Sequence, residues 1–187
     1  MLTTNQLWQM LPVAIFTCLG AFGSAVMAEE PAAWRVYIGT YSEGENGGIF
    51  QAILNPADGT LSEPKLAAQA VKPSFVAIHP SQKFLYAIGQ AGIVDGKPVR
   101  GAVAYSIDAK TGMLTRLNAQ SSEGAGPCHL TVDKAGRNVL MANYSGGSVS
   151  VLPIRPDGLL EPASAFIQHE GHSVDPRRQA GPHAHSI

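Results

Sequence analysis

Three short segments of the chain alternate between apolar and polar residues and are rich in β-branched side chains. They cover residues 47–53, 101–107 and 147–153. A turn-forming pair follows each segment, namely Asp58-Gly59, Thr111-Gly112 and Asp157-Gly158. Alternate side chains of a strand point to opposite faces, so period-two runs bounded by turn residues predict antiparallel hairpins. Further apolar runs predict the neighbouring strands at residues 34–41, 84–90 and 139–145.

The prolines mark an internal repeat. Pro73, Pro127 and Pro182 lie 54 and then 55 residues apart, and similar residues surround each of them. The repeated segments are residues 72–78, 126–132 and 181–187. One repeat therefore holds about four short antiparallel strands, which is the sequence signature of a β-propeller blade. A β-sandwich is the competing all-β fold, but a sandwich does not predict a repeat of this length.

The expected strands amount to about three blades, whereas roughly four to eight blades close a propeller ring. The first blade lacks its first strand, as expected if a later segment returns to complete it. We therefore expect the N-terminal part of a longer protein, with a partial propeller domain at residues 29–187 that ends within a strand. Such a chain alone should be inactive and aggregation-prone, because apolar blade faces would be exposed. The alternative is a complete chain that closes by oligomerising.

Residues 1–28 have the pattern of a secretory signal peptide. A mostly apolar stretch at residues 11–22 is followed by Val26 and Ala28, at the positions where a signal peptidase requires small side chains. The apolar stretch is too short for a membrane-spanning helix. Residues 1–10 contain no Lys or Arg, so an uncleaved membrane anchor is the alternative. We expect an exported protein, periplasmic or secreted.

Composition and charge narrow the possible partners. The chain has 13 basic and 14 acidic side chains, a net charge of −1 and 45% apolar residues. A nucleic-acid-binding surface needs clustered cations, so this balance argues against such a partner. The 20 Gly and 13 Pro residues are typical of short elements joined by tight turns, which suits an all-β fold. Two cysteines are too few for a scaffold stabilised by several disulfides.

Candidate chemistry gathers near the end of the sequence. His183 and His185 are two residues apart, so on a strand they share one face, which we expect to line a central channel. Imidazole titrates near neutrality and can act as a general base toward water. Arg177, Arg178 and Gln179 precede the pair, and an Arg there can hold a carboxylate or phosphate through two hydrogen bonds.

Other interpretations of the histidine pair stay open. The pair can be structural, with both rings hydrogen-bonded along a channel. It can also supply two metal ligands, with His169, His172 and Glu170 as loosely placed candidates for a third.

The second copy of the repeat carries two further reactive side chains. In the aligned repeat His129 takes the place of Phe75 and Ala184, while alternation directs Cys128 to the opposite face. We expect His129 to contribute to substrate binding. We expect Cys128 to be a small packing residue rather than a nucleophile.

Three motifs resemble one known family. They are Tyr37-Ile38-Gly39-Thr40-Tyr41, residues 141–154, and residues 175–186 with Arg-Arg-Gln before Pro-His-Ala-His. They look like the lactonase family of seven-bladed β-propellers, which includes bacterial 6-phosphogluconolactonases and is related to fungal carboxymuconate cyclases. The resemblance covers residues 34–187 and would correspond to about the first half of a family member.

The resemblance implies an enzyme of carbohydrate metabolism that hydrolyses a sugar lactone, such as 6-phosphogluconolactone, without a metal or an organic cofactor. It supports His183 and His185 as catalytic residues at the channel mouth, and Arg177 or Arg178 as the anchor of an acidic substrate. Two alternatives stay open. One is a non-enzymatic propeller that binds a ligand or a protein, since a fold does not fix a chemistry. The other is an isomerase that closes a muconate-like dicarboxylate.

Overall fold

The polypeptide forms three antiparallel sheets, each built from consecutive strands of the chain. The structure is a computed structural model that describes residues 33–94 and 96–187. The first sheet contains β1 (Trp34–Ile38), β2 (Gly48–Leu54) and β3 (Lys65–Gln69), with the 3-10 helix η1 (Gly44–Asn46) between β1 and β2. The second sheet contains β4 (Val76–Ile78), β5 (Phe84–Val94), β6 (Lys97–Ile107) and β7 (Leu114–Ser121). The third contains β8 (Pro127–Val132), β9 (Asn138–Asn143), β10 (Ser148–Pro153) and β11 (Ala165–Gln168).

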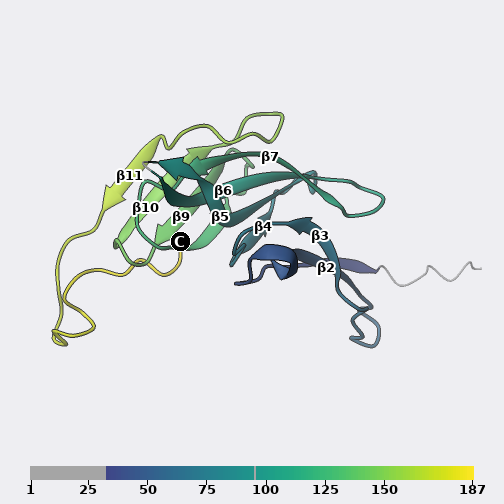
Figure 1. Ribbon diagram of the computed structural model, residues 1–187, viewed down its shortest axis with the longest axis horizontal. Helices are drawn as coiled ribbons and strands as arrows, with labels where there is room; N and C mark the ends of the chain where they lie inside the picture. Colours follow the sequence, from purple (N-terminus) through teal and green to yellow (C-terminus); the bar gives the residue numbers. More distant parts are fainter. Residues whose placement is uncertain (1–32, 95) are drawn as a thin grey trace, which may run out of the picture. The chain divides into compact units, whose positions relative to one another are not determined.

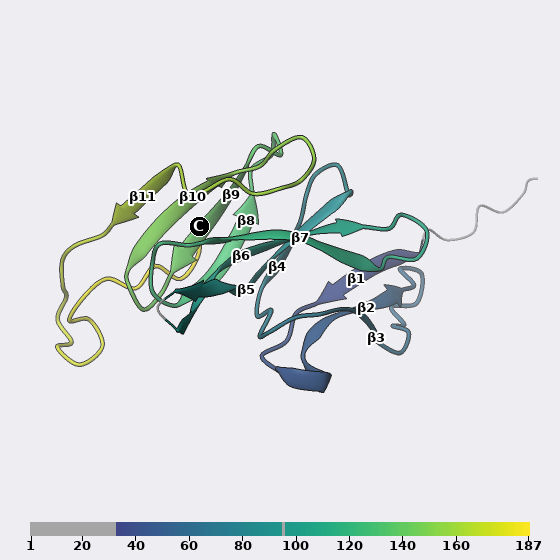
Figure 2. The same ribbon diagram turned by 45° about the horizontal axis from the view of Figure 1, so that its top comes forward.

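These sheets confirm the predicted all-β blade pattern. Strand order within every sheet follows chain order, and every pair is antiparallel. The sheets lie side by side, with the β4–β7 sheet between the other two (Figures 1 and 2). The first sheet has three strands and each of the others has four, as the repeat predicts.

Several details differ from the sequence-based expectation. Strand β1 ends at Ile38 and β9 at Asn143, before the expected ends at residues 41 and 145. Strand β5 continues beyond the expected end at Gln90, and β5 and β6 stay paired out to Val94 opposite Lys97. Asp95-Gly96 is a hairpin signal that the sequence analysis overlooked. The strand expected at residues 181–187 does not form. The segment lies against β8 through Cys128 and His129, but no backbone ladder pairs it with a described strand.

The middle sheet is buried on both faces. On β5, Leu85 and Ala87 pack with Val103 and Tyr105 of β6 against the first sheet. The alternate residues of the same two strands face the third sheet, where they pack with Leu130, Met141 and Leu152. These alternate residues are Tyr86, Ile88, Ala102 and Ala104. This explains why β5 is a nearly continuous apolar run, since a strand covered on both sides has no polar face.

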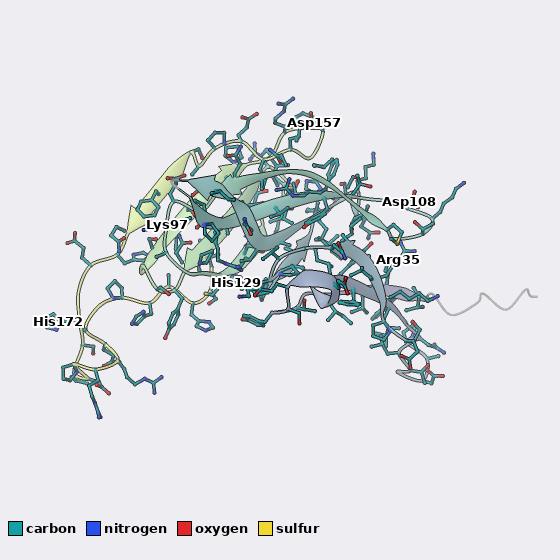
Figure 3. The ribbon with its side chains drawn as sticks, viewed as in Figure 1. Arg35, Lys97, Asp108, His129, Asp157 and His172 are labelled. Atoms are coloured by element: carbon teal, nitrogen blue, oxygen red, sulfur yellow. The ribbon has the colours of Figure 1, made fainter. Side chains whose placement is uncertain are left out.

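Side chains of one sheet also bond to turns of the next sheet. The Tyr37 hydroxyl donates to the carbonyl oxygen of Gly112 at 2.8 Å, and the Tyr86 hydroxyl donates to that of Gly158 at 3.1 Å. Both glycines have positive φ, 75° and 84°. A Cβ atom at Gly112 would collide with Arg35, and one at Gly158 would collide with the Phe84 ring. Figure 3 shows Arg35 beside the turn that contains Asp108.

A third contact of this kind involves His79. Its Nε2 atom lies 2.8 Å from the carbonyl oxygen of Gly136, while the backbone N–H of Ser81 donates to its Nδ1 atom at 3.0 Å. A carbonyl can only accept, so Nε2 carries the proton and the ring is a neutral link between the second and third sheets. The turn glycines predicted from sequence therefore serve both as turns and as docking points.

The N-terminal expectations fall partly beyond the structure. The expected signal peptide, residues 1–28, lies outside the described residues. In the part of the chain that is described, no helix has the length and apolar character needed to cross a membrane.

The Tyr86 tether can be tested by substitution. Tyr86 is fully buried, and Tyr86→Phe removes only the hydroxyl that bonds to Gly158. The free energy of unfolding should fall by about 1–2 kcal/mol, because the carbonyl stays buried without its donor. Urea denaturation measures the change. Tyr41→Phe is the matched control, since Tyr41 is 78% exposed and its substitution should leave the unfolding midpoint unchanged. Equal midpoints for wild type and Tyr86→Phe would contradict the tether.

Candidate functional site

The three repeated segments meet at the end of the sheets where β4 and β8 begin. The rings of Phe75 and His129 have centroids 4.5 Å apart. The backbone N–H of Ile187 donates to His129 Nδ1 at 3.4 Å, which brings the third copy of the repeat to the second. Repeats 54 and 55 residues apart in sequence thus form one cluster. His129 and its aligned counterpart Phe75 lie in direct contact.

Tyr144, which follows β9, is the centre of this cluster. The His183 ring stacks on the Tyr144 ring at 4.6 Å and 19°, and the His185 ring meets it edge-on at 5.4 Å and 89°. His183 Nδ1 also lies 3.0 Å from the Tyr144 carbonyl oxygen. This carbonyl can only accept, so Nδ1 of His183 carries a proton and donates it to the Tyr144 carbonyl oxygen. Both histidines are therefore brought together by one tyrosine rather than by a shared strand face.

A hollow of about 440 Å³ opens on the His185 side of Tyr144. Tyr41, Ser74, Cys128 and Ser145 are among its lining residues. Two cations, Lys72 and Arg100, also line it, and the described residues contribute no carboxylate to its wall. Neither cation was predicted from the sequence as a site residue. Lys72 could have been found from the repeat, because it stands where the next two copies have glycine.

A second hollow, of about 460 Å³, lies on the His183 side. Arg178 and Gln179 line it together with His172 and Ser173. Arg178, Gln179 and Tyr144 also border a third hollow of about 350 Å³. Two of the three residues predicted to bind substrate in this loop therefore lie beside the histidine pair.

Asp175 organises the loop that carries these residues. Its carboxylate accepts the backbone N–H of Arg177 at 2.9 Å and that of Arg178 at 3.3 Å. Its own N–H donates to the side-chain oxygen of Gln179 at 3.1 Å. Gln179 is thus held within the loop, and Arg177 lines none of the three hollows described above.

Cys128 has the surroundings of a packing residue. Its thiol lies 3.4 Å from the carbonyl oxygen of His185 and 3.7 Å from that of Ala142. Burial raises the pKa of this thiol, which opposes formation of the nucleophilic thiolate. The thiol therefore helps to fix the His185 backbone and is poorly suited to attack a substrate.

The metal interpretation of the histidines finds no support in the geometry. Among residues 33–94 and 96–187, no three His, Cys, Asp or Glu side chains are grouped closely enough to hold an ion. Figure 3 shows His172 in the long loop before residue 181. His172 and Glu170 border the same hollow as His183, but the three do not form a group that could hold an ion.

Comparisons with known proteins agree with this architecture. Residues 35–187 match the family model described as lactonase, 7-bladed beta-propeller. The chain is 41% identical over 149 residues to a 6-phosphogluconolactonase of Bacillus subtilis (strain 168), covering 80% of this chain and 41% of that protein. A putative 6-phosphogluconolactonase structure from Bacteroides fragilis superposes with a TM-score of 0.70 at 35% identity, covering 81% of this chain and 40% of the other.

A third relative is named as a periplasmic protein. The structure of a periplasmic gluconolactonase from Pseudomonas aeruginosa superposes with a TM-score of 0.67 at 30% identity, covering 83% of this chain and 42% of the other. The chain spans about two fifths of the length of the relatives it matches.

The surroundings of His129 predict a pH effect on stability. Burial lowers the pKa of His129, and the nearby charge of His185 lowers it further. The unfolded chain then binds more protons, so this stabilising contribution is present above pH 6.5 and is lost as the pH falls toward the lowered pKa. Thermal unfolding between pH 7.5 and 5.5 should show a falling Tm that His129→Phe makes less steep. His169→Phe, on an exposed residue, should keep the wild-type slope. Parallel curves for wild type and His129→Phe would refute this assignment.

Proposed function

The chain belongs to the lactonase family of seven-bladed β-propellers, and from this membership we propose that the protein hydrolyses a sugar lactone to the open-chain acid. The names of its relatives, 6-phosphogluconolactonase and gluconolactonase, support a six-carbon aldonic acid lactone as the substrate type. The observation that carries the proposal is the hollow that His185 shares with Lys72, Arg100 and Tyr144.

Lactone hydrolysis makes three demands on such a site. Water must lose a proton as it attacks the carbonyl carbon, the carbonyl oxygen must be stabilised as it gains charge, and the ring oxygen must gain a proton as its bond to carbon breaks. In our proposal His185 takes the proton from the attacking water and returns it to the departing ring oxygen. The water adds to the carbonyl carbon, so the products are a carboxylic acid and a free hydroxyl group, and no other reactant is consumed.

His183 has a different part in this proposal. Its Nδ1–H is committed to the Tyr144 carbonyl and its ring lies flat on the Tyr144 ring, so it fixes the position of the tyrosine between the two hollows. We assign Arg178 and Gln179 to substrate binding on the His183 side, where they share a hollow with that ring. Arg177, which lines none of these hollows, contributes through its backbone bond to Asp175.

We further propose that the protein acts after export. The signal-like pattern of residues 1–28 motivates this, and a periplasmic gluconolactonase among the structural neighbours supports it. Fractionation of cells that produce the protein, followed by N-terminal sequencing, tests it. Material in the periplasm or medium that begins near residue 29 supports export. Cytoplasmic material with an intact N-terminus overturns it.

Substitution of His185 tests the reaction. In the full-length gene product, His185→Asn should lower kcat for glucono-δ-lactone or its 6-phosphate by about 100-fold or more, with KM little changed, because the residue acts on the attacking water. Hydrolysis is followed by acid release in a pH indicator assay. His183→Asn should reduce both kcat and substrate affinity more mildly, since the tyrosine position is disturbed.

The control for this test is His169→Asn. His169 is exposed and lines none of the hollows, so its variant should match wild type. Equal kcat for His185→Asn and wild type would remove His185 from the mechanism. A wild-type protein that binds lactones without turning them over would favour the binding-module interpretation. Ring closure of a muconate-like dicarboxylate would favour the isomerase.

A further inference from the structure

Two cations on one wall of the His185 hollow come from distant parts of the sequence. Lys72 precedes β4, whereas Arg100 lies near the start of β6, in the extended part of the β5–β6 hairpin. The Arg100 Nη2 atom donates to the Lys72 carbonyl oxygen at 3.0 Å. Among the described residues this is the hydrogen bond that fixes the guanidinium, and its remaining N–H donors can serve a ligand.

The backbone of Lys72 is in an uncommon conformation for a residue with a side chain. Its φ is 48°, in the left-handed region, and the aligned Gly126 has φ 65°. Glycine adopts this region without steric cost, whereas lysine does so only where surrounding contacts impose it. Its N–H donates to the Ser42 carbonyl at 3.0 Å, and its own carbonyl accepts from Ser74 at 2.8 Å as well as from Arg100. These backbone hydrogen bonds hold Lys72 in the left-handed conformation and so fix the point from which its side chain extends.

The charge of this wall is only partly balanced. Lys72 Nζ lies 3.4 Å from a carboxylate oxygen of Glu43, but both side chains are well exposed, at 45% and 62%. An ion pair this exposed is weak and easily exchanged for another anion. Arg100 is half-buried and has no carboxylate within salt-bridge distance among the described residues. The wall therefore offers a net positive site beside His185.

We propose that Lys72 and Arg100 form an anion-recognition site, which binds the phosphate or carboxylate at the end of the sugar chain remote from the reacting carbonyl. A guanidinium fork and an ammonium group are complementary to such an oxyanion. The exposed rings of Tyr41 and Tyr144 border the same hollow and can cover the polyol chain between the anion and His185. This inference rests on the proposed lactonase function for its substrate orientation, but the binding site itself can be measured without turnover.

The test uses three unreactive polyols in titration calorimetry with the full-length gene product. Glucitol 6-phosphate carries a phosphate at C6, L-gulonate carries a carboxylate at the same end of the same chain, and glucitol carries neither. At least one anionic polyol should bind at least about tenfold more tightly than glucitol, and the stronger one identifies the anion. Lys72→Gln and Arg100→Gln should each remove most of this preference. The double variant should bind all three polyols alike, and added salt should weaken the wild-type preference.

Two further variants separate recognition from folding. Lys72→Gly deletes the cation and suits the positive φ, so it should fold at least as well as wild type yet lose the preference for anions. Arg100→Lys keeps the positive charge but loses the planar guanidinium, which can donate two hydrogen bonds to one anion. This variant should therefore keep part of the preference for anionic polyols. Lys134→Gln and Arg137→Gln remove exposed cations from the turn before β9, outside the hollows, and should change nothing.

The outcomes distinguish this site from the reaction. A double variant that still prefers the anionic polyol, or a wild-type protein that shows no preference, overturns the recognition site even if lactones are hydrolysed. A preference that disappears with Lys72 and Arg100 supports the site even if the protein hydrolyses no lactone, in which case only the proposed reaction fails.

Discussion

The arrangement of this molecule depends on the burial of the β4–β7 sheet on both faces. Adjacent residues of one strand, Leu85 and Tyr86, belong to two different apolar clusters, one shared with each neighbouring sheet. Apolar surface on both sides of a sheet is stable only when both sides are covered. Stacking of the three sheets follows from this requirement. It brings the starts of β4 and β8 together, which is where Phe75 and His129 touch.

The turn glycines fix how far the sheets are offset. A hydroxyl or imidazole of one sheet bonds to the carbonyl oxygen of Gly112, Gly158 or Gly136 in the next. Each of these glycines has a positive φ, and a Cβ there would strike a side chain of the preceding sheet. Apolar burial is not directional, so the two apolar clusters alone do not set the position of one sheet relative to the next. The hydrogen bonds between sheets are directional and set this position. Within the middle sheet, Arg100 of the β5–β6 hairpin bonds to the carbonyl oxygen of Lys72, in the segment that leads from the first sheet into β4.

The repeat predicted the sheets well, because strand, turn and glycine positions are local properties that recur in each copy. Residues near the site were harder to predict. The contact between His183 and Tyr144 joins residues 39 apart and depends on two rings that no local pattern pairs. The strand expected at residues 181–187 does not form, since a strand needs a neighbour that pairs with its backbone, and β8 contacts this segment through side chains instead. Proximity of His183 and His185 was anticipated, but its cause is Tyr144.

The candidate site lies where the copies of the repeat diverge. Residues that form the strands and turns are similar in each copy of the repeat. In the alignment of the copies, however, Lys72 corresponds to Gly126 and His129 corresponds to Phe75. Lys72 is in a left-handed conformation that glycine adopts more easily, and burial lowers the pKa of His129. Departures of this kind carry a local energetic cost, which the surrounding hydrogen bonds to Lys72 offset. Lys72 borders the same hollow as Tyr144, whose ring contacts His183 and His185, and His129 bonds to the end of the segment that carries both histidines. The departures from the repeat therefore lie close together around the candidate site.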